Sequence, residues 1–169
     1  MRPELKPVEG LSLSDMALQE VNIPEYTVTL VPENYINTIW DDAKPLLMGG
    51  VDKSNNRWSI ETLYYALMQG EQHMWVAFDE DKNITSVLTT QFITYPTKLS
   101  LAVQFAGGLE GQTSTSIFDC VLDRLETFAA ESGCTCVEFW GRKGFAPWMR
   151  EAGYEETSVF YEKDISHGR

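Results

Sequence analysis

The sequence has little positive charge. Only 13 residues are Lys or Arg against 25 that are Asp or Glu, which gives a formal net charge of −12 over 169 residues. Nucleic-acid binding requires clustered basic side chains that displace counterions from phosphates, and the densest basic stretch here is Arg142-Lys143. We therefore expect no nucleic-acid partner; acidic balance by itself favours solubility.

Cysteine, histidine and long apolar runs are also scarce. The three cysteines are an odd number, which argues against a disulfide framework, and together with two histidines they make a poor metal-ligand set. No apolar run approaches the roughly 18 residues of a membrane span, and residues 1–10 have no apolar stretch of the signal-peptide kind. These features predict a cytoplasmic protein with no metal and no membrane contact.

The chain does have the apolar content of one compact domain. Hydrophobic residues make up 43% of it, and two domains would each be too small to bury enough surface. Residues 1–24 differ from the rest, because prolines interrupt them and their helical pattern is weak. We interpret residues 1–24 as an arm that packs on the domain or on a protein partner, and residues 25–169 as the domain.

Periodicity along the chain predicts alternating blocks of strands and helices. Alternating or β-branched runs indicate strands, and apolar residues at helical spacing between caps and breakers indicate helices. Strands are expected at 26–31, 74–78, 84–95, 99–105, 135–140 and 158–163, and helices at 32–45, 59–70, 116–132 and 145–152.

This order of elements predicts a mixed α/β sheet. Three consecutive strands joined by short polar turns are typical of an antiparallel meander. The strand at 99–105, the helix at 116–132 and the strand at 135–140 form a crossover unit, which should be parallel and right-handed.

The same order, with a glycine-rich break after the fourth strand, resembles the GNAT acyltransferase superfamily over residues 26–165. The segment LETFAAESGC (125–134) resembles the family's helix that ends in A-x-x-x-G. The segments VEFWGRKGF (137–145) and MREAGY (149–154) are similar to a divergent branch of the kind found in tailed-phage genomes. The resemblance implies a GNAT-like fold, acetyl-CoA as cofactor and N-acyl transfer as the activity. The phage branch implies other virion proteins as partners.

In the GNAT superfamily the loop after the fourth strand binds the pyrophosphate of acetyl-CoA. A helix N-terminus offers free N–H groups and a positive dipole end to such an anion. The spacing here differs from the family pattern, and Glu110 adds a negative charge, so an ordinary turn with a Ser/Thr cap is the competing interpretation. The candidate cofactor-binding residues are Gly107, Gly108, Gly111, Gln112, Thr113, Ser114 and Thr115.

The resemblance also exposes missing catalytic groups. Acylation of an amine needs a base for the ammonium and an acid for the leaving thiolate. Met149 occupies the place of the family's tyrosine acid, and the fourth strand has Gln104 where a carboxylate is common. Glu138 as base and Tyr154 as acid are the candidate substitutes. The competing interpretations are that Glu138 faces solvent or pairs with a nearby cation, and that Tyr154 is a packing residue.

Two functions from different classes follow. The first is a GNAT-fold protein with eroded motifs, weakly active or inactive, which binds a protein partner through residues 1–24 and belongs to a phage virion. The second is an active acetyl-CoA-dependent N-acetyltransferase that acts on a small amine or a protein amine, and for which the acidic surface would attract a cationic substrate.

Overall fold

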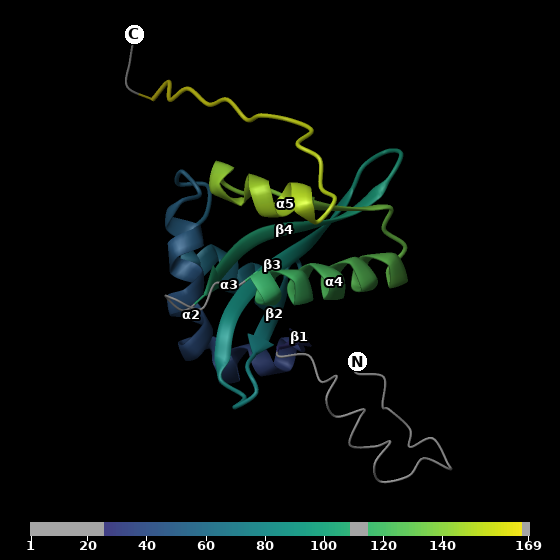
Figure 1. Ribbon diagram of the computed structural model, residues 1–169. Helices are drawn as coiled ribbons and strands as arrows, with labels where there is room; N and C mark the ends of the chain where they lie inside the picture. The colour runs from purple at the N-terminus through teal and green to yellow at the C-terminus, as the bar shows by residue number, and fades with distance from the viewer. Residues whose placement is uncertain (1–25, 109–114, 167–169) are drawn as a thin grey trace, which may run out of the picture.

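A computed structural model describes residues 26–108 and 115–166, which form one five-stranded sheet with helices on both faces (Figure 1). The predicted arm at 1–24 lies outside the described residues. None of the described helices combines the length and the apolar character needed to cross a bilayer. In chain order the elements are β1 (Thr27–Val31), the 3-10 helix η1 (Glu33–Tyr35), α2 (Ile36–Asp52), α3 (Ile60–Met68), β2 (His73–Phe78), β3 (Ile84–Thr94), β4 (Leu99–Gly108), α4 (Thr115–Glu131), β5 (Cys136–Phe139), the 3-10 helix η2 (Lys143–Phe145) and α5 (Ala146–Glu151).

The sheet confirms the predicted mixed topology. Strands β1 to β4 are antiparallel neighbours in sequence order, and β5 pairs with β4 in parallel. The long helix α4 supplies the crossover that a parallel pair requires. The antiparallel meander and the parallel unit therefore meet at β4, which is the strand that both share.

Side-chain alternation along the strands divides the core into two layers. On one face, Met74 and Val76 of β2 pack with α2 and α3. On the other face, Trp75 and Ala77 pack against α4. All four of these strand residues are fully buried, so β2 is covered on both faces of the sheet.

Helix α2 corrects the expectation of a helix that ends at Pro45. It continues to Asp52 through Pro45 and two glycines. Its buried stripe continues at helical spacing beyond the proline, as Ala43, Leu47 and Val51. Burial of that stripe outweighs the hydrogen bond that the proline removes, because Pro45 itself lies on the exposed side of the helix.

The expected strand at 158–163 is wrong. Residues 154–165 form no helix or strand, and every residue from 155 to 166 is exposed. Figure 1 shows this segment leaving α5 and running away from the sheet. The sequence pattern favours a strand, but a strand forms only when its backbone finds a partner edge.

Candidate functional site

The parallel strands β4 and β5 separate at a β-bulge. Thr89 of β3 pairs with Phe105 and Thr90 pairs with Val103, so Gln104 between them has no register partner on β3. A bulge bends the strand that carries it. The last β4–β5 pair is Val103 with Phe139, at the same point along β4. Sequence reasoning missed this bulge because nothing in the apolar run around Gln104 marks one.

Beyond the bulge, β4 continues past the end of its pairing with β5, and we call the space beside this unpaired edge the opening. β4 continues to Gly108 in register with β3, while β5 ends at Phe139. Within residues 26–108 and 115–166 no strand pairs with the outer edge of this part of β4. The opening is therefore bordered by strand backbone.

The first two candidate cofactor-binding glycines belong to β4. Gly107 pairs with Val87 and Gly108 with Ser86. A Cβ on Gly107 would lie 1.7 Å from the carbonyl oxygen of Leu46 in α2, so only glycine allows this approach of helix to strand. Packing thus accounts for Gly107, whatever binds in the opening.

The structure says little about the other five candidate cofactor-binding residues. Gly111, Gln112, Thr113 and Ser114 lie outside the described residues, and Thr115 is the first residue of α4. A role of this segment in binding a phosphate group stays a prediction.

Aromatic rings fill the space between α4, β5 and α5. The rings of Phe118 and Phe145 are stacked at 6.3 Å, and Phe139 meets Phe145 at 5.5 Å. Trp148 of α5 completes this aromatic cluster, 5.9 Å from Phe118. Such ring pairs contribute about 0.5–1.5 kcal/mol each beyond the area that they bury. The cluster fixes α5 on the same face of the sheet as α4.

A hollow of about 290 Å³ lies beside this cluster. Its lining residues are Phe118 and Asp119 from α4, and Trp148, Glu151 and Ala152 at the end of α5. Both ionisable side chains of the lining are carboxylates. The hollow therefore repels anions. Met149, in the place of the family's acid, is half-buried in α5.

Glu138 is held by a phenol from the β3–β4 turn. The hydroxyl of Tyr95 donates a hydrogen bond of 3.0 Å to the Glu138 carboxylate, and this bond raises the pKa of Tyr95. Val137 and Phe139 pack in the core layer beneath α4. Alternation therefore directs Glu138 to the opposite face of the sheet. Neither Arg142 nor Lys143 forms an ion pair with it among the described residues.

Tyr154 belongs to the α4 face. Its hydroxyl donates a hydrogen bond of 3.0 Å to the carboxylate of Glu126 on α4. Burial, followed by the hydrogen bond to Glu126, strongly raises the pKa of Tyr154. The structure therefore does not bring Glu138 and Tyr154 together, and their roles as base and acid stay predictions.

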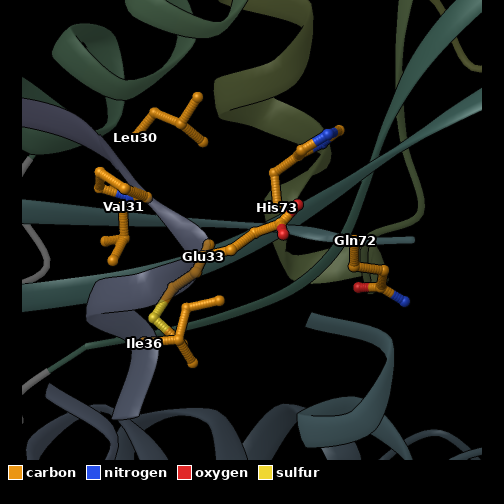
Figure 2. Close-up of a pocket in the computed structure, with 8 residues that line it drawn as sticks. Leu30, Val31, Glu33, Ile36, Gln72 and His73 are labelled. Carbon is orange, nitrogen blue, oxygen red and sulfur yellow. The ribbon is translucent and has the colours of Figure 1, made fainter. Parts of the chain in front are cut away.

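A second hollow, of about 300 Å³, lies where β1 ends and β2 begins (Figure 2). Burial lowers the pKa of His73, whose ring packs against Phe92 and Phe128. Gln72 is 2% exposed, and its amide has no hydrogen-bond partner among the described residues. Figure 2 shows this amide apart from the carboxylate of Glu33. The polar groups of this hollow thus do not converge on one point.

Comparisons with known proteins rest on structure alone. No family model matches the sequence, and no curated protein matches it. Solved structures do. A predicted acetyltransferase from Clostridium acetobutylicum, solved with acetyl-CoA, is 16% identical, with 83% of this chain and 96% of that chain covered and a TM-score of 0.62.

Two further neighbours are acetyltransferases with different named substrates. An aminoglycoside acetyltransferase from an uncultured soil metagenomic sample, solved with sisomicin, is 18% identical over 84% of this chain and 97% of that chain, with a TM-score of 0.60. Glucosamine-6-phosphate N-acetyltransferase from Arabidopsis thaliana is 9% identical over 83% and 99%, also with a TM-score of 0.60. The chain therefore has the fold of the GNAT acetyltransferases.

Proposed function

We propose that this chain is a GNAT-fold protein that has lost most or all acyl transfer and acts through contacts with other proteins. One observation carries the proposal. The described segments that border the opening, 103–108 on β4 and 139–141 from the end of β5, contain no ionisable side chain. Proton transfer in amine acylation requires such groups within hydrogen-bond reach of the reacting atoms.

The substitutes suggested by the sequence do not repair this deficit. Glu138 and Tyr154 lie on opposite faces of the sheet and each is already paired, Glu138 with Tyr95 and Tyr154 with Glu126. A base and an acid that serve one thioester must reach the same small volume. With the sheet between them, these two side chains support no shared proton-transfer step.

The charge beside the opening also disfavours acetyl-CoA. The α4–α5 hollow carries Asp119 and Glu151 and no basic side chain in its lining. A diphosphate that approached these carboxylates would meet like charge, at about 1 kcal/mol for each pair at 4 Å in water and more where water is excluded. This supports weak binding of the cofactor or none.

A GNAT-fold protein that no longer transfers acyl groups can still act by binding another protein. The resemblance to the tailed-phage branch leads us to propose a virion or assembly protein, with residues 1–24 as the segment that contacts its partner. Removing residues 1–24 should then abolish association with that partner and leave the melting temperature of the domain unchanged.

Thermal melting with and without acetyl-CoA tests the proposal. Binding to the folded state at a hundredfold excess over Kd adds about 2.7 kcal/mol, or roughly 5–11 °C in Tm at about 2–4 °C per kcal/mol for a chain of this size. We expect no change at millimolar acetyl-CoA. Inorganic pyrophosphate is the matched control for nonspecific anion effects. A saturable rise with acetyl-CoA that pyrophosphate does not reproduce contradicts the proposal.

The free edge of β4 favours a second candidate, an active acetyl-CoA-dependent N-acetyltransferase. Strand backbone beyond Gln104 offers unpaired N–H and C=O groups toward the opening, and these suit a ligand that contains amides, as the pantetheine arm of acetyl-CoA does. Backbone contacts of this kind need no particular side chains.

Release of thiol from acetyl-CoA, measured with a polyamine, an aminoglycoside and a lysine peptide, tests this candidate. If Glu138 is the base, Glu138→Gln lowers kcat by roughly 100-fold or more. Glu162→Gln, which changes an exposed carboxylate paired with Arg57, is the matched control and leaves kcat unchanged. Thiol release no faster than without protein rejects this candidate.

A further inference from the structure

The segment after α5 carries large apolar side chains that are mostly exposed to solvent. Val159, Phe160, Tyr161 and Ile165 are 58%, 77%, 87% and 85% exposed. They are half of the eight large hydrophobic residues exposed in the described part of the chain. Such a concentration in one short segment is typical of an interaction site. We call residues 155–166 the tail.

The tail is built as a strand but lacks a strand partner. Residues 158–163 read Ser-Val-Phe-Tyr-Glu-Lys, a β-branched and aromatic run. Within the described chain, the backbone of residues 155–165 forms no hydrogen bond with another segment. The tail contacts the rest of the domain through two side chains. Glu162 forms an ion pair with Arg57, and the ring of Phe160 packs under the guanidinium of the same arginine.

The sheet has a matching vacancy at β5. This strand ends the sheet, and no described segment pairs with its outer edge. All four residues from Cys136 to Phe139 are only half-buried, whereas the central residues of β2 are fully buried. An open edge of half-covered side chains is a template for an added strand. Six residues of tail span roughly 20 Å, enough to cover the four residues of β5.

The tail is acidic, and two cations lie just beyond the end of β5, a strand whose own charged residue is Glu138. The tail carries Glu155, Glu156, Glu162 and Asp164 against one lysine, Lys163. After Trp140 and Gly141, which follow β5, come Arg142 and Lys143, both exposed and without an ion pair among the described residues. These two cations would flank a tail laid along β5, and opposite charge guides and orients such an encounter.

We propose that the tail of one copy adds a strand to the β5 edge of a second copy, and that the second copy returns its own tail. Within one molecule the tail does not follow its own β5. It runs out beyond α5 instead (Figure 1). There the side chains of Phe160 and Glu162 contact Arg57 on the α2–α3 connection. The exchange is reciprocal and therefore closes as a symmetric dimer, a common result of segment exchange. It does not involve the opening beside β4.

Mass measured by light scattering across a concentration series tests the dimer. We expect the full chain to be dimeric at tens of micromolar. The double variant Phe160→Pro/Tyr161→Pro removes two backbone N–H donors from the strand segment and should weaken the dimer at least tenfold. Glu155→Pro/Glu156→Pro is the matched control, with two prolines in the same exposed tail before the strand, and it should stay dimeric. Because all four positions are exposed, neither variant should change the melting of the domain at concentrations below the dimer Kd. Above it, loss of the dimer should lower the Tm of the strand variant alone.

Hydrogen exchange identifies the receiving edge. Amides of Cys136–Phe139 should exchange more slowly in the dimer than in the Phe160→Pro/Tyr161→Pro variant. A full chain that stays monomeric throughout the concentration series overturns the proposal. So does a dimer with unchanged Kd in the strand variant, or equal exchange at β5. Deletion of residues 1–24 should leave the dimer intact, and its loss would assign the interface to the arm instead.

Discussion

Single residues in this chain are best understood from what they touch. Gly107 was predicted as part of a phosphate-binding loop, and the structure gives it a second explanation, because the carbonyl of Leu46 fills the place of its side chain. A Cβ on Gly50 of α2 would lie 3.4 Å from the carbonyl oxygen of Ala106, which is an ordinary contact distance. Gly107 is therefore the residue that lets helix α2 approach β4 closely.

Replacing Gly107 by alanine should destabilise the protein by about 3 kcal/mol, because the helix backbone must move to admit the methyl group. Gly49→Ala is the matched control. Nothing lies within 4 Å of a Cβ at Gly49, and the residue is inside α2, so alanine there should stabilise by about 0.5–1 kcal/mol. Urea unfolding of both variants measures this. A Gly107→Ala protein as stable as the parent contradicts the close-packing account.

At the scale of elements, helix α2 shows the limit of local signals. Pro45 and the pair Gly49-Gly50 each predict the end of a helix, and the helix passes through all three. Proline and glycine lower the stability of a helix at their own positions. The gain comes from Leu47 and Val51, which are buried against β-strands far away in sequence.

Pro45→Ala should stabilise the protein by about 1–2 kcal/mol. It restores a helix hydrogen bond and removes the clash of the ring with the preceding turn, against a smaller loss from a freer unfolded chain. Pro147→Ala is the matched control, because Pro147 lies in the first turn of α5, where proline is tolerated. Chemical unfolding of the two variants should show a gain at Pro45 alone. Equal effects at both positions would contradict this account.

The element scale also explains what the sequence could predict. The strands up to β5 and helix α4 follow from periodicity, since each has an apolar face that finds a partner within the chain. The tail has the pattern of a strand but pairs with no edge of its own sheet, and pattern alone does not reveal that. The bulge at Gln104 depends on the register with β3, which is set by the hairpin and not by the residue.

The candidate site was harder to predict than the fold. Parity along β5 does place Glu138 opposite Val137 and Phe139, but only the packing of α4 shows which face that is. The partners Tyr95 and Glu126 are distant in sequence from the residues they bind, Glu138 and Tyr154. No local pattern could have named them.

At the scale of the molecule, the two layers of the core have different roles. α2 and α3 cover one face of the sheet, and α4 with α5 covers the other (Figure 1). The opening lies where the pairing of β4 with β5 ends. The acyltransferase neighbours share this architecture. In this chain aromatic rings and carboxylates lie next to the opening.

The most direct test of the central claim is a nuclear magnetic resonance titration of the tryptophan indoles with acetyl-CoA. Trp148 lines the hollow beside the opening, and Trp75 is the internal reference, fully buried with its indole N–H bonded to Thr90 at 2.9 Å. We predict that the Trp148 signal stays in place, as the Trp75 signal does, up to millimolar acetyl-CoA. A saturable displacement of the Trp148 signal, with the Trp75 signal unmoved, would contradict the account. It would show that the protein binds acetyl-CoA beside the opening, as an acyltransferase must.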